Sequence, residues 1–360
     1  MVKIIRVNIR VKYRVNIKVK LNFTQKTSHC VCVHCSELSA VTEMERLLQV
    51  IQNIEAENKN LLVNPVVELK RDDEEEHKGS DLFRELVERK TLEEHTNFSQ
   101  FEILNLWHKV EPKIGAHRRR GPRPKVSYLD SMIILLIFYK SALDFDHIAA
   151  FINKKSNTIV NAINRIRPLV LEALTESWWS QRRRPVPVPE SDYPHIGLLI
   201  DSTSLQVFRP KGRFEEAIAY YDGKNKMYAL KKEVAVMATE PHFALFSSDG
   251  FVGSKHDYSY FVENYAVYLD YLKKTTEEKR ALLNDRHAFW SVCQDKGYIG
   301  PAEDTREIRR IIPRKNVRSI EDSSFNNYIS GLRGNVERFF GRLKMLWKIS
   351  KVFLDVFYCN

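Results

Sequence analysis

The sequence lacks several features that would place it at once in a large class of proteins. No run of about 18 consecutive apolar residues occurs, so no segment is expected to cross a membrane. The first residues lack the continuous apolar stretch of a signal peptide. Five cysteines in 360 residues are few and odd in number, which excludes a disulfide framework. A reducing compartment is therefore expected, the nucleus in a eukaryote and the cytoplasm otherwise.

A complete zinc-binding pattern is also missing. Three of the five cysteines lie in HCVCVHC (residues 29–35), which has the right residue types for zinc. No second pair of Cys or His residues follows at a ligand spacing, and a tetrahedral site would need one. Ordinary free thiols are therefore favoured over a metal site in this segment.

Acidic residues are outnumbered by basic ones. Lys and Arg number 57 and Asp and Glu 46, which leaves a formal charge of +11 and weakly favours a polyanionic partner. The segment KIGAHRRRGPRPK (113–125) contains no acid at all. Its Arg118, Arg119 and Arg120 are predicted to contact a DNA backbone or minor groove. The alternative is a solvated basic linker.

The first 180 residues divide into two parts. Residues 1–110 remain unassigned and partly disordered, with a strand-like alternation over 1–23 and a charged linker over 70–80. Residues 111–180 are predicted to form a small all-α domain of three helices. Asp144 or Asp146 is placed to cap the second helix, and Ser156 to cap the third.

The short turn between the second and third of these helices has helix-turn-helix spacing. The third helix would then present Asn157, Asn161 and Arg165, which are residue types that contact bases or phosphates. Three-helix units without DNA share this pattern, so both interpretations stay open.

The segment RRRPVPVPE (182–190) cannot continue a helix and is predicted to be a domain boundary. Beyond it, HIGLLID is typical of a buried strand that ends in an acid, Asp201. An antiparallel meander with DGKNK as its turn follows, and then a helix over about 257–279 opened by a capping box from Ser254 to Asp257. A strand ending at Asp295, another strand and a long basic helix complete the chain. This order indicates an α/β domain of the ribonuclease-H type over residues 190–350, with a mixed sheet flanked by helices.

The last helix carries one acid between two cations. At roughly 100° per residue, Glu337 lies about 40° and Lys344 about 20° from Arg333 around the helix axis. One face would therefore hold a carboxylate for a hard cation and two cations for a nucleic-acid backbone. An exposed salt-bridged face is the simpler alternative.

Five segments arrive in a familiar order: DSTS, YYDGKNKMYALKKEVAV, GSKHD, QDKGYIG and RGNVERFFGRLK. Together they resemble the DDE transposases of the PIF/Harbinger type and their bacterial insertion-sequence relatives. The resemblance extends over roughly residues 115–350, because the preceding helices are similar to that family's N-terminal helix-turn-helix unit. The spacing R-x3-E-x6-K is intact at Arg333, Glu337 and Lys344. The family's Tyr three residues before the Arg is replaced by Ser330.

The resemblance implies a catalytic triad of Asp201, Asp295 and Glu337. It also implies that these acids bind a divalent cation, Mg²⁺ or Mn²⁺, and that Asp257 of GSKHD is either an auxiliary ligand or only a helix cap. The implied activity is cleavage and strand transfer at transposon ends in double-stranded DNA, by a homo-oligomer or together with a separate DNA-binding protein. The alternative is a domesticated DNA-binding protein that no longer transposes.

Overall fold

A computed structural model describes residues 81–116, 124–176, 184–188, 191–210, 213–282, 285–301 and 303–351. The predictions for residues 1–80 and for Arg118, Arg119 and Arg120 lie outside these ranges. The described chain forms two compact units. The helical unit comprises the described residues of 81–176 together with 344–351, and the α/β unit comprises those of 184–343.

The helical unit is built around one apolar helix. Its elements are α3 (Asp81–Glu88), α4 (Leu92–Thr96), α5 (Gln100–Ala116), α6 (Tyr128–Ser141), α7 (Phe145–Phe151), α8 (Ser156–Leu174) and the short 3-10 helix η4 (Lys348–Lys351). Helix α6 is buried on nearly all sides, as expected for a helix that is apolar all round. It packs against α3, α4, α8 and η4. The unit is therefore larger than the predicted segment 111–180.

The predicted N-terminal cap is correct for α7 and wrong for α8. The Asp144 carboxylate accepts a hydrogen bond from the His147 amide at 2.8 Å, so Asp144 caps α7 as expected. Ser156 does not cap α8, and that prediction is wrong. Lys155 holds the N-cap position, while the Ser156 hydroxyl donates to Asp146 instead. This side-chain bond ties the two helices together across their turn.

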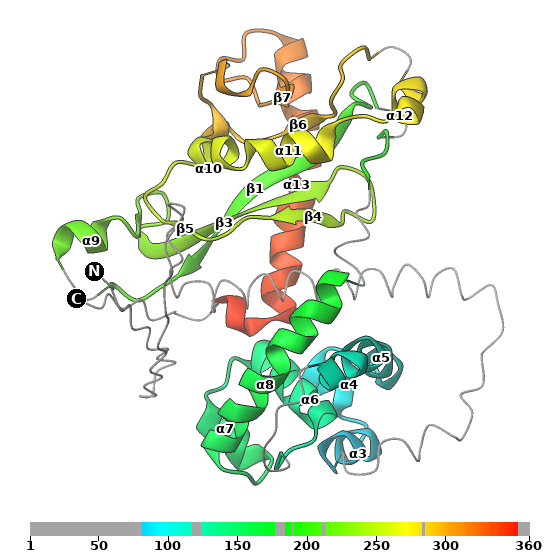
Figure 1. Cartoon of the computed structure of the whole chain (residues 1–360). Coiled ribbons are helices and arrows are strands. Elements are labelled where there is room, and N and C mark those ends of the chain that lie inside the picture. Colours follow the sequence, from blue (N-terminus) through cyan, green and yellow to red (C-terminus); the bar gives the residue numbers. More distant parts are fainter. Residues whose placement is uncertain are drawn as a thin grey trace. The chain divides into compact units, whose positions relative to one another are not determined.

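The α/β unit contains a mixed seven-stranded sheet, which confirms the predicted class (Figure 1). The strands are β1 (Ile196–Gln206), β2 (Tyr221–Asp222), β3 (Met227–Met237), β4 (Ala244–Ser247), β5 (Phe251–Val252), β6 (Ser291–Cys293) and β7 (Arg310–Ile311). Strands β2, β4 and β5 all pair with β3, which lies antiparallel to β1. On the other side of β1, strands β6 and β7 follow in parallel. This mixed arrangement is consistent with the ribonuclease-H fold.

Strand β1 does not end at Asp201, contrary to the prediction. It continues to Gln206, because β3 is long enough to pair with it over its whole polar second half. The pairing with β6, however, stops at Leu199. Asp201 therefore lies just past the end of the parallel ladder while still inside the antiparallel one.

Helices cover both faces of the sheet. One face packs against α10 (Asp257–Glu263) and α11 (Tyr265–Leu272), whose Phe261 and Tyr268 meet Leu198 and Ile200 in the main core. Helix α13 (Ile320–Leu346) lies on the opposite face (Figure 1). The remaining short elements are α9 (Phe214–Ile218), α12 (Thr276–Ala281), η2 (Lys296–Tyr298) and η3 (Glu303–Thr305). No helix in the part of the chain that the structure describes is long and apolar enough to span a membrane.

The predicted helix over about 257–279 is three helices, and its predicted capping box is wrong. His256, not Ser254, is the N-cap of α10, and no side-chain cap hydrogen bond forms there. The helical conformation is interrupted at Asn264 and again before Thr275. A capping box between Thr275 and Glu278 begins α12. Asp257 is thus not a helix cap, and its carboxylate is available for other contacts.

Candidate functional site

Asp201 and Asp295 are brought together by the parallel ladder between β1 and β6. Leu199 and Cys293 are its last paired residues, and each acid lies two positions further along its own chain. Because side chains alternate along strands, residues two positions apart share a face. Both carboxylates therefore emerge on the α13 face at the carboxyl ends of neighbouring parallel strands, where acidic residues of α/β sheets commonly form sites. The parallel pairing of β1 with β6 thus brings together two acids that are far apart in the sequence.

Helix α13 supplies a third carboxylate and the cation that joins all three. The Nη2 atom of Arg333 lies 3.7 Å from Asp201 Oδ2, 3.9 Å from Asp295 Oδ2 and 3.6 Å from Glu337 Oε1. These are ion pairs longer than hydrogen bonds, and the Arg333 Nε is buried with no hydrogen-bond partner. One guanidinium nitrogen thus stands among three acids without a tight bond to any of them. We refer to Asp201, Asp257, Asp295 and Glu337 as the acid cluster.

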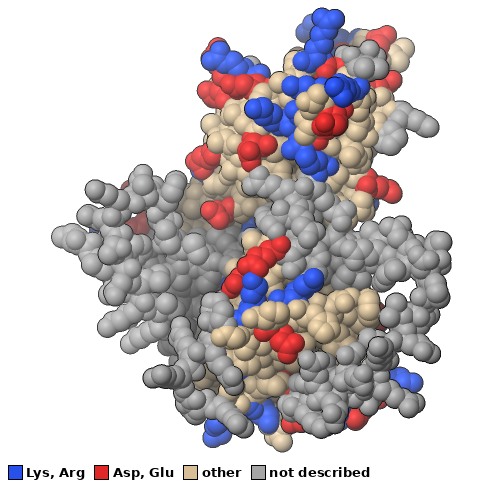
Figure 2. All heavy atoms as spheres, turned by 45° about the vertical axis from the view of Figure 1, so that its right-hand side comes forward, with Lys and Arg blue, Asp and Glu red and all other residues tan. Residues whose placement is uncertain are grey.

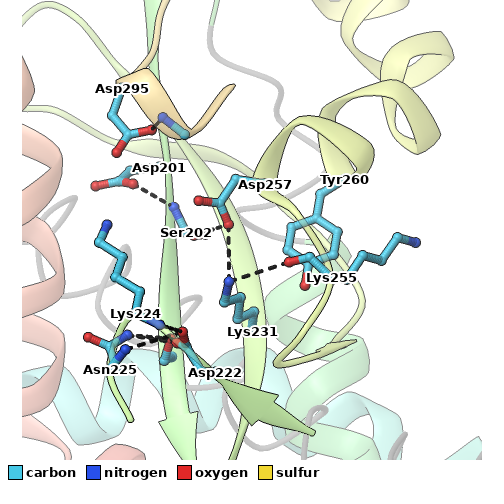
Figure 3. Close-up of polar contacts among 12 residues, drawn as sticks. Asp201, Ser202, Asp222, Lys224, Asn225, Lys231, Lys255, Asp257, Tyr260 and Asp295 are labelled. Carbon is cyan, nitrogen blue, oxygen red and sulfur yellow. Dashed lines mark hydrogen bonds and ion pairs between the residues drawn. The ribbon is translucent and has the colours of Figure 1, made fainter. Parts of the chain in front are cut away.

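Asp257 reaches the acid cluster from the other face of the sheet (Figure 3). Its Oδ1 accepts a hydrogen bond from the Ser202 hydroxyl at 3.0 Å and lies 3.6 Å from the Lys231 ammonium. Gly297 lies close to both Asp257 and Asp295. A Cβ added to it would be 2.8 Å from Asp257 Oδ2 and 2.8 Å from Asp295 Oδ1. Asp257 is therefore held on one side and faces Asp295 across a glycine on the other.

Burial and like charges make the ionised form of Asp201 costly. Burial is the largest cause and, with the charges of Asp295 and Asp257, raises the pKa of Asp201 to about 6. The Ser202 amide and Arg333 act in the opposite direction but do not compensate. A site of this kind is stabilised by added positive charge.

The chemistry of the acid cluster suits a divalent cation. All its donors are carboxylate oxygens, the ligands that Mg²⁺ and Mn²⁺ prefer. The distances around Arg333 Nη2 exceed the about 2.1 Å that Mg²⁺ takes to oxygen. Within the described ranges no three side chains lie in an arrangement ready to hold a metal ion. The residue types and the charge of the acid cluster therefore suit a divalent cation, although the carboxylates are not yet close enough together to bind one.

The structure does not join the other predicted site residues to the acid cluster. Lys344 follows Arg333 by about three turns of α13, where the helix has entered the helical unit. Asn157 and Asn161 are exposed on α8. Arg165 turns inward, donating to the Val126 carbonyl at 2.8 Å and the Ser131 hydroxyl at 2.7 Å. Contacts of these residues with DNA stay predictions.

Sequence reasoning missed the residues that support the acids. Ser202 and Lys231 hold Asp257, and Gly297 makes room between two carboxylates. All three lie inside the quoted motifs DSTS, YYDGKNKMYALKKEVAV and QDKGYIG. Their roles depend on contacts between segments far apart in the sequence, which no local spacing indicates.

The basic excess of the sequence is not gathered into one patch on the face seen in Figure 2. There, the Lys and Arg side chains of the described surface are mixed with Asp and Glu.

Comparison with known protein families finds a match in the second half of the chain. Residues 200–358 match the model of a family described as DDE superfamily endonuclease. This range contains the whole acid cluster and supports a transposase-like nuclease. No curated protein and no solved structure matches the chain.

Proposed function

We propose that this chain is a transposase-type DNA endonuclease that depends on a divalent cation. One observation carries the proposal: carboxylates from β1, the segment after β6 and α13 lie around a single guanidinium nitrogen. The family match over residues 200–358 supports the same conclusion independently of that geometry. The PIF/Harbinger type is the finer assignment within this proposal, supported by the order of the five motifs.

In the proposed reaction, water displaces an oxygen in line at phosphorus and breaks a DNA strand. Asp201, Asp295 and Glu337 would hold the divalent cation, with Asp257 beside them. When bound, such a cation lowers the pKa of the attacking water and stabilises the leaving oxygen. Strand transfer is the same displacement with a 3′ hydroxyl in place of water. Arg333 lies where it can pair with a phosphate oxygen once the acids are neutralised.

The proposed substrate is double-stranded DNA, held by the helical unit as well as by the α/β unit. On α8, Asn157, Asn161 and Asn164 are exposed along one side of the helix. Asparagine amides can both donate to and accept from base edges. Arg165 supports α8 from inside through Val126 and Ser131, so the asparagines are the readers in this proposal. Assembly into a homo-oligomer or with a separate DNA-binding protein would bring two DNA ends together.

The test compares Asp201→Asn with Asp249→Asn in a nicking assay on duplex DNA with Mg²⁺. Asp201→Asn keeps the size of the side chain and removes its charge, so cleavage should fall at least about a hundredfold while DNA binding persists. Asp249 is an exposed acid outside the acid cluster, and Asp249→Asn should cut like the wild type. Binding of the same duplex is measured separately. There, the double variant Asn157→Ala with Asn161→Ala should have a lower affinity for DNA than the wild type.

Cleavage at the wild-type rate by Asp201→Asn would remove that residue from the proposed site. A wild-type chain that binds DNA and never cuts it, with Mg²⁺ or Mn²⁺, would instead favour the domesticated DNA-binding protein. Unchanged binding by the double asparagine variant would remove α8 from the DNA interface.

A further inference from the structure

Lys231 is a cation beside the acid cluster that the proposed reaction does not yet use. It lies on β3, paired with Ser204 of β1 and with Phe251 of β5. Its side chain is only 12% exposed. A partly desolvated ammonium next to carboxylates has either a structural role or a ligand.

The contacts of the Lys231 ammonium are long. It lies 3.6 Å from Asp257 Oδ1 and 3.4 Å from the backbone carbonyl of Lys255. The short bond to Asp257 Oδ1 comes from the Ser202 hydroxyl, at 3.0 Å. An ammonium has three N–H donors, and these contacts leave its capacity for a strong acceptor largely unused.

A neighbouring lysine has a different environment. The Lys255 ammonium pairs with Glu263 and lies 4.8 Å and 5.5 Å from the ring centres of Phe251 and Tyr260. The Lys255 ammonium therefore interacts with residues outside the acid cluster. Lys231, by contrast, is directed into the cluster by Asp257, as Figure 3 shows.

The charges around Lys231 favour an anion once a divalent cation is present. Two cations, Arg333 and Lys231, contact the four acids of the cluster. Divalent cations would reverse this excess of negative charge. A phosphodiester is then the complementary ligand, and lysine binds phosphate as a point charge without a fixed orientation.

We propose that Lys231 is a phosphate-binding residue, held by Asp257 beside the acid cluster so that it pairs with a backbone phosphate of the DNA strand. The inference rests on the proposed function in taking DNA as the ligand. It also gives Asp257 a defined role, because its Oδ1 holds Lys231 while its Oδ2 faces Asp295.

The experiment measures binding of the full chain to a labelled random-sequence duplex over a series of KCl concentrations. Ca²⁺ is kept at a constant concentration throughout, because Lys231 is expected to favour a phosphate once a divalent cation neutralises the acid cluster. Lys231→Met removes the charge and keeps the length of the side chain. Its affinity should fall about fivefold, and the dependence of log affinity on log salt should become shallower by about one ion. Lys231→Arg should keep the wild-type salt dependence. Lys279→Met is the matched control, because Lys279 is exposed on α12 and its replacement removes the same charge elsewhere on the α/β unit.

Circular dichroism and a thermal melt establish that each variant is folded, and Lys231→Gln replaces Lys231→Met if the latter unfolds. Wild-type affinity and salt dependence in the neutral variant would overturn the proposal. So would an equal loss in Lys279→Met. Loss of Mn²⁺ affinity with unchanged DNA binding would make Lys231 only a positioning residue for Asp257, and would overturn it as well.

Failure of this inference can be told from failure of the proposed function. If the wild type binds and cuts DNA while Lys231→Met binds normally, only the inference fails. If the wild type neither binds duplex DNA nor cuts it with Mg²⁺, both fail.

Discussion

At the scale of single residues, Asp201 combines a catalytic assignment with a cost to folding. Its side chain is 16% exposed, and its ionised form is disfavoured by burial and by Asp295 and Asp257. Its pKa is about 6 in the folded chain against an ordinary value of 3.8. The folded state therefore binds more protons than the unfolded state between these two values, and stability falls as pH rises through that range.

Replacing Asp201 with Asn should remove this pH dependence. Between about pH 4 and pH 6 the wild type should lose about 3 kcal/mol that Asp201→Asn retains, since one pKa unit corresponds to about 1.4 kcal/mol. Urea unfolding of both proteins at a series of pH values measures the difference. Glu233, whose pKa burial raises to about 7, titrates in both proteins and cancels in the comparison. Parallel curves for the two proteins would contradict the assigned pKa.

At the scale of elements, the turn η2 decides how Asp257 and Asp295 meet. Asp295 caps this turn, its Oδ1 accepting from the Gly297 amide at 2.6 Å. Gly297 has no side chain, and a Cβ added there would lie 2.8 Å from an oxygen of each carboxylate. A Cβ added at Gly300 would lie 2.4 Å from the ring of Tyr258, so the loop after η2 packs closely against α10.

The variant Gly297→Ala should separate the two carboxylates without unfolding the chain. The added methyl would lie 2.8 Å from Asp257 Oδ2 and Asp295 Oδ1, so both side chains must rotate away. Affinity for Mn²⁺, measured by calorimetry, should fall about tenfold or more, and cleavage should fall with it. Gly331→Ala on α13 is the control, because nothing lies within 4 Å of its added Cβ. It should stabilise the helix by about 0.5–1 kcal/mol. Unchanged Mn²⁺ affinity in Gly297→Ala would show that Asp257 and Asp295 do not share a cation.

At the scale of the whole molecule, two separate segments of the chain contribute to the helical unit. Residues 344–351 return to it after the α/β unit is complete. Trp347 is fully buried there, 6.0 Å between ring centres from Phe98, and the Leu346 carbonyl accepts from the Asn97 amide at 2.7 Å. The helical unit is thus completed by the end of α13, the same helix that carries Arg333 and Glu337.

Trp347→Ala should therefore destabilise the helical unit selectively, by about 3–5 kcal/mol. Hydrogen exchange followed by mass spectrometry is the measurement: amides of α6 and α8 should exchange faster while those of β1 and β3 keep their protection. Met345→Ala is the control, since Met345 is 67% exposed on the same stretch of chain. Equal loss of protection in both units would mean that they unfold as one.

Several features of this protein follow from local patterns that one sequence contains. An apolar run that ends in an acid predicts a buried strand carrying a carboxylate, and this pattern singles out Asp201. The prediction of Asp295 rests more on the resemblance of the segment QDKGYIG to the transposase motif. The spacing of Arg333 and Glu337, one helical turn apart, predicts the ion pair that the structure shows at 3.6 Å. The α/β class and the hairpin turn at DGKNK rest on the same kind of signal, because hydrophobic period and turn chemistry act over a few residues.

The remaining features were decided by the tertiary structure. The extension of β1 beyond Asp201 depends on the length of β3, which lies more than twenty residues away in the sequence. Ser202 and Lys231 hold Asp257 only because β1, β3 and the start of α10 meet in space. Hydrogen-bond register, burial and long-range ion pairs arise from packing between segments. Local patterns and the resemblance of the motifs could therefore name the acids, whereas only the folded chain could show which cations and hydroxyls hold them.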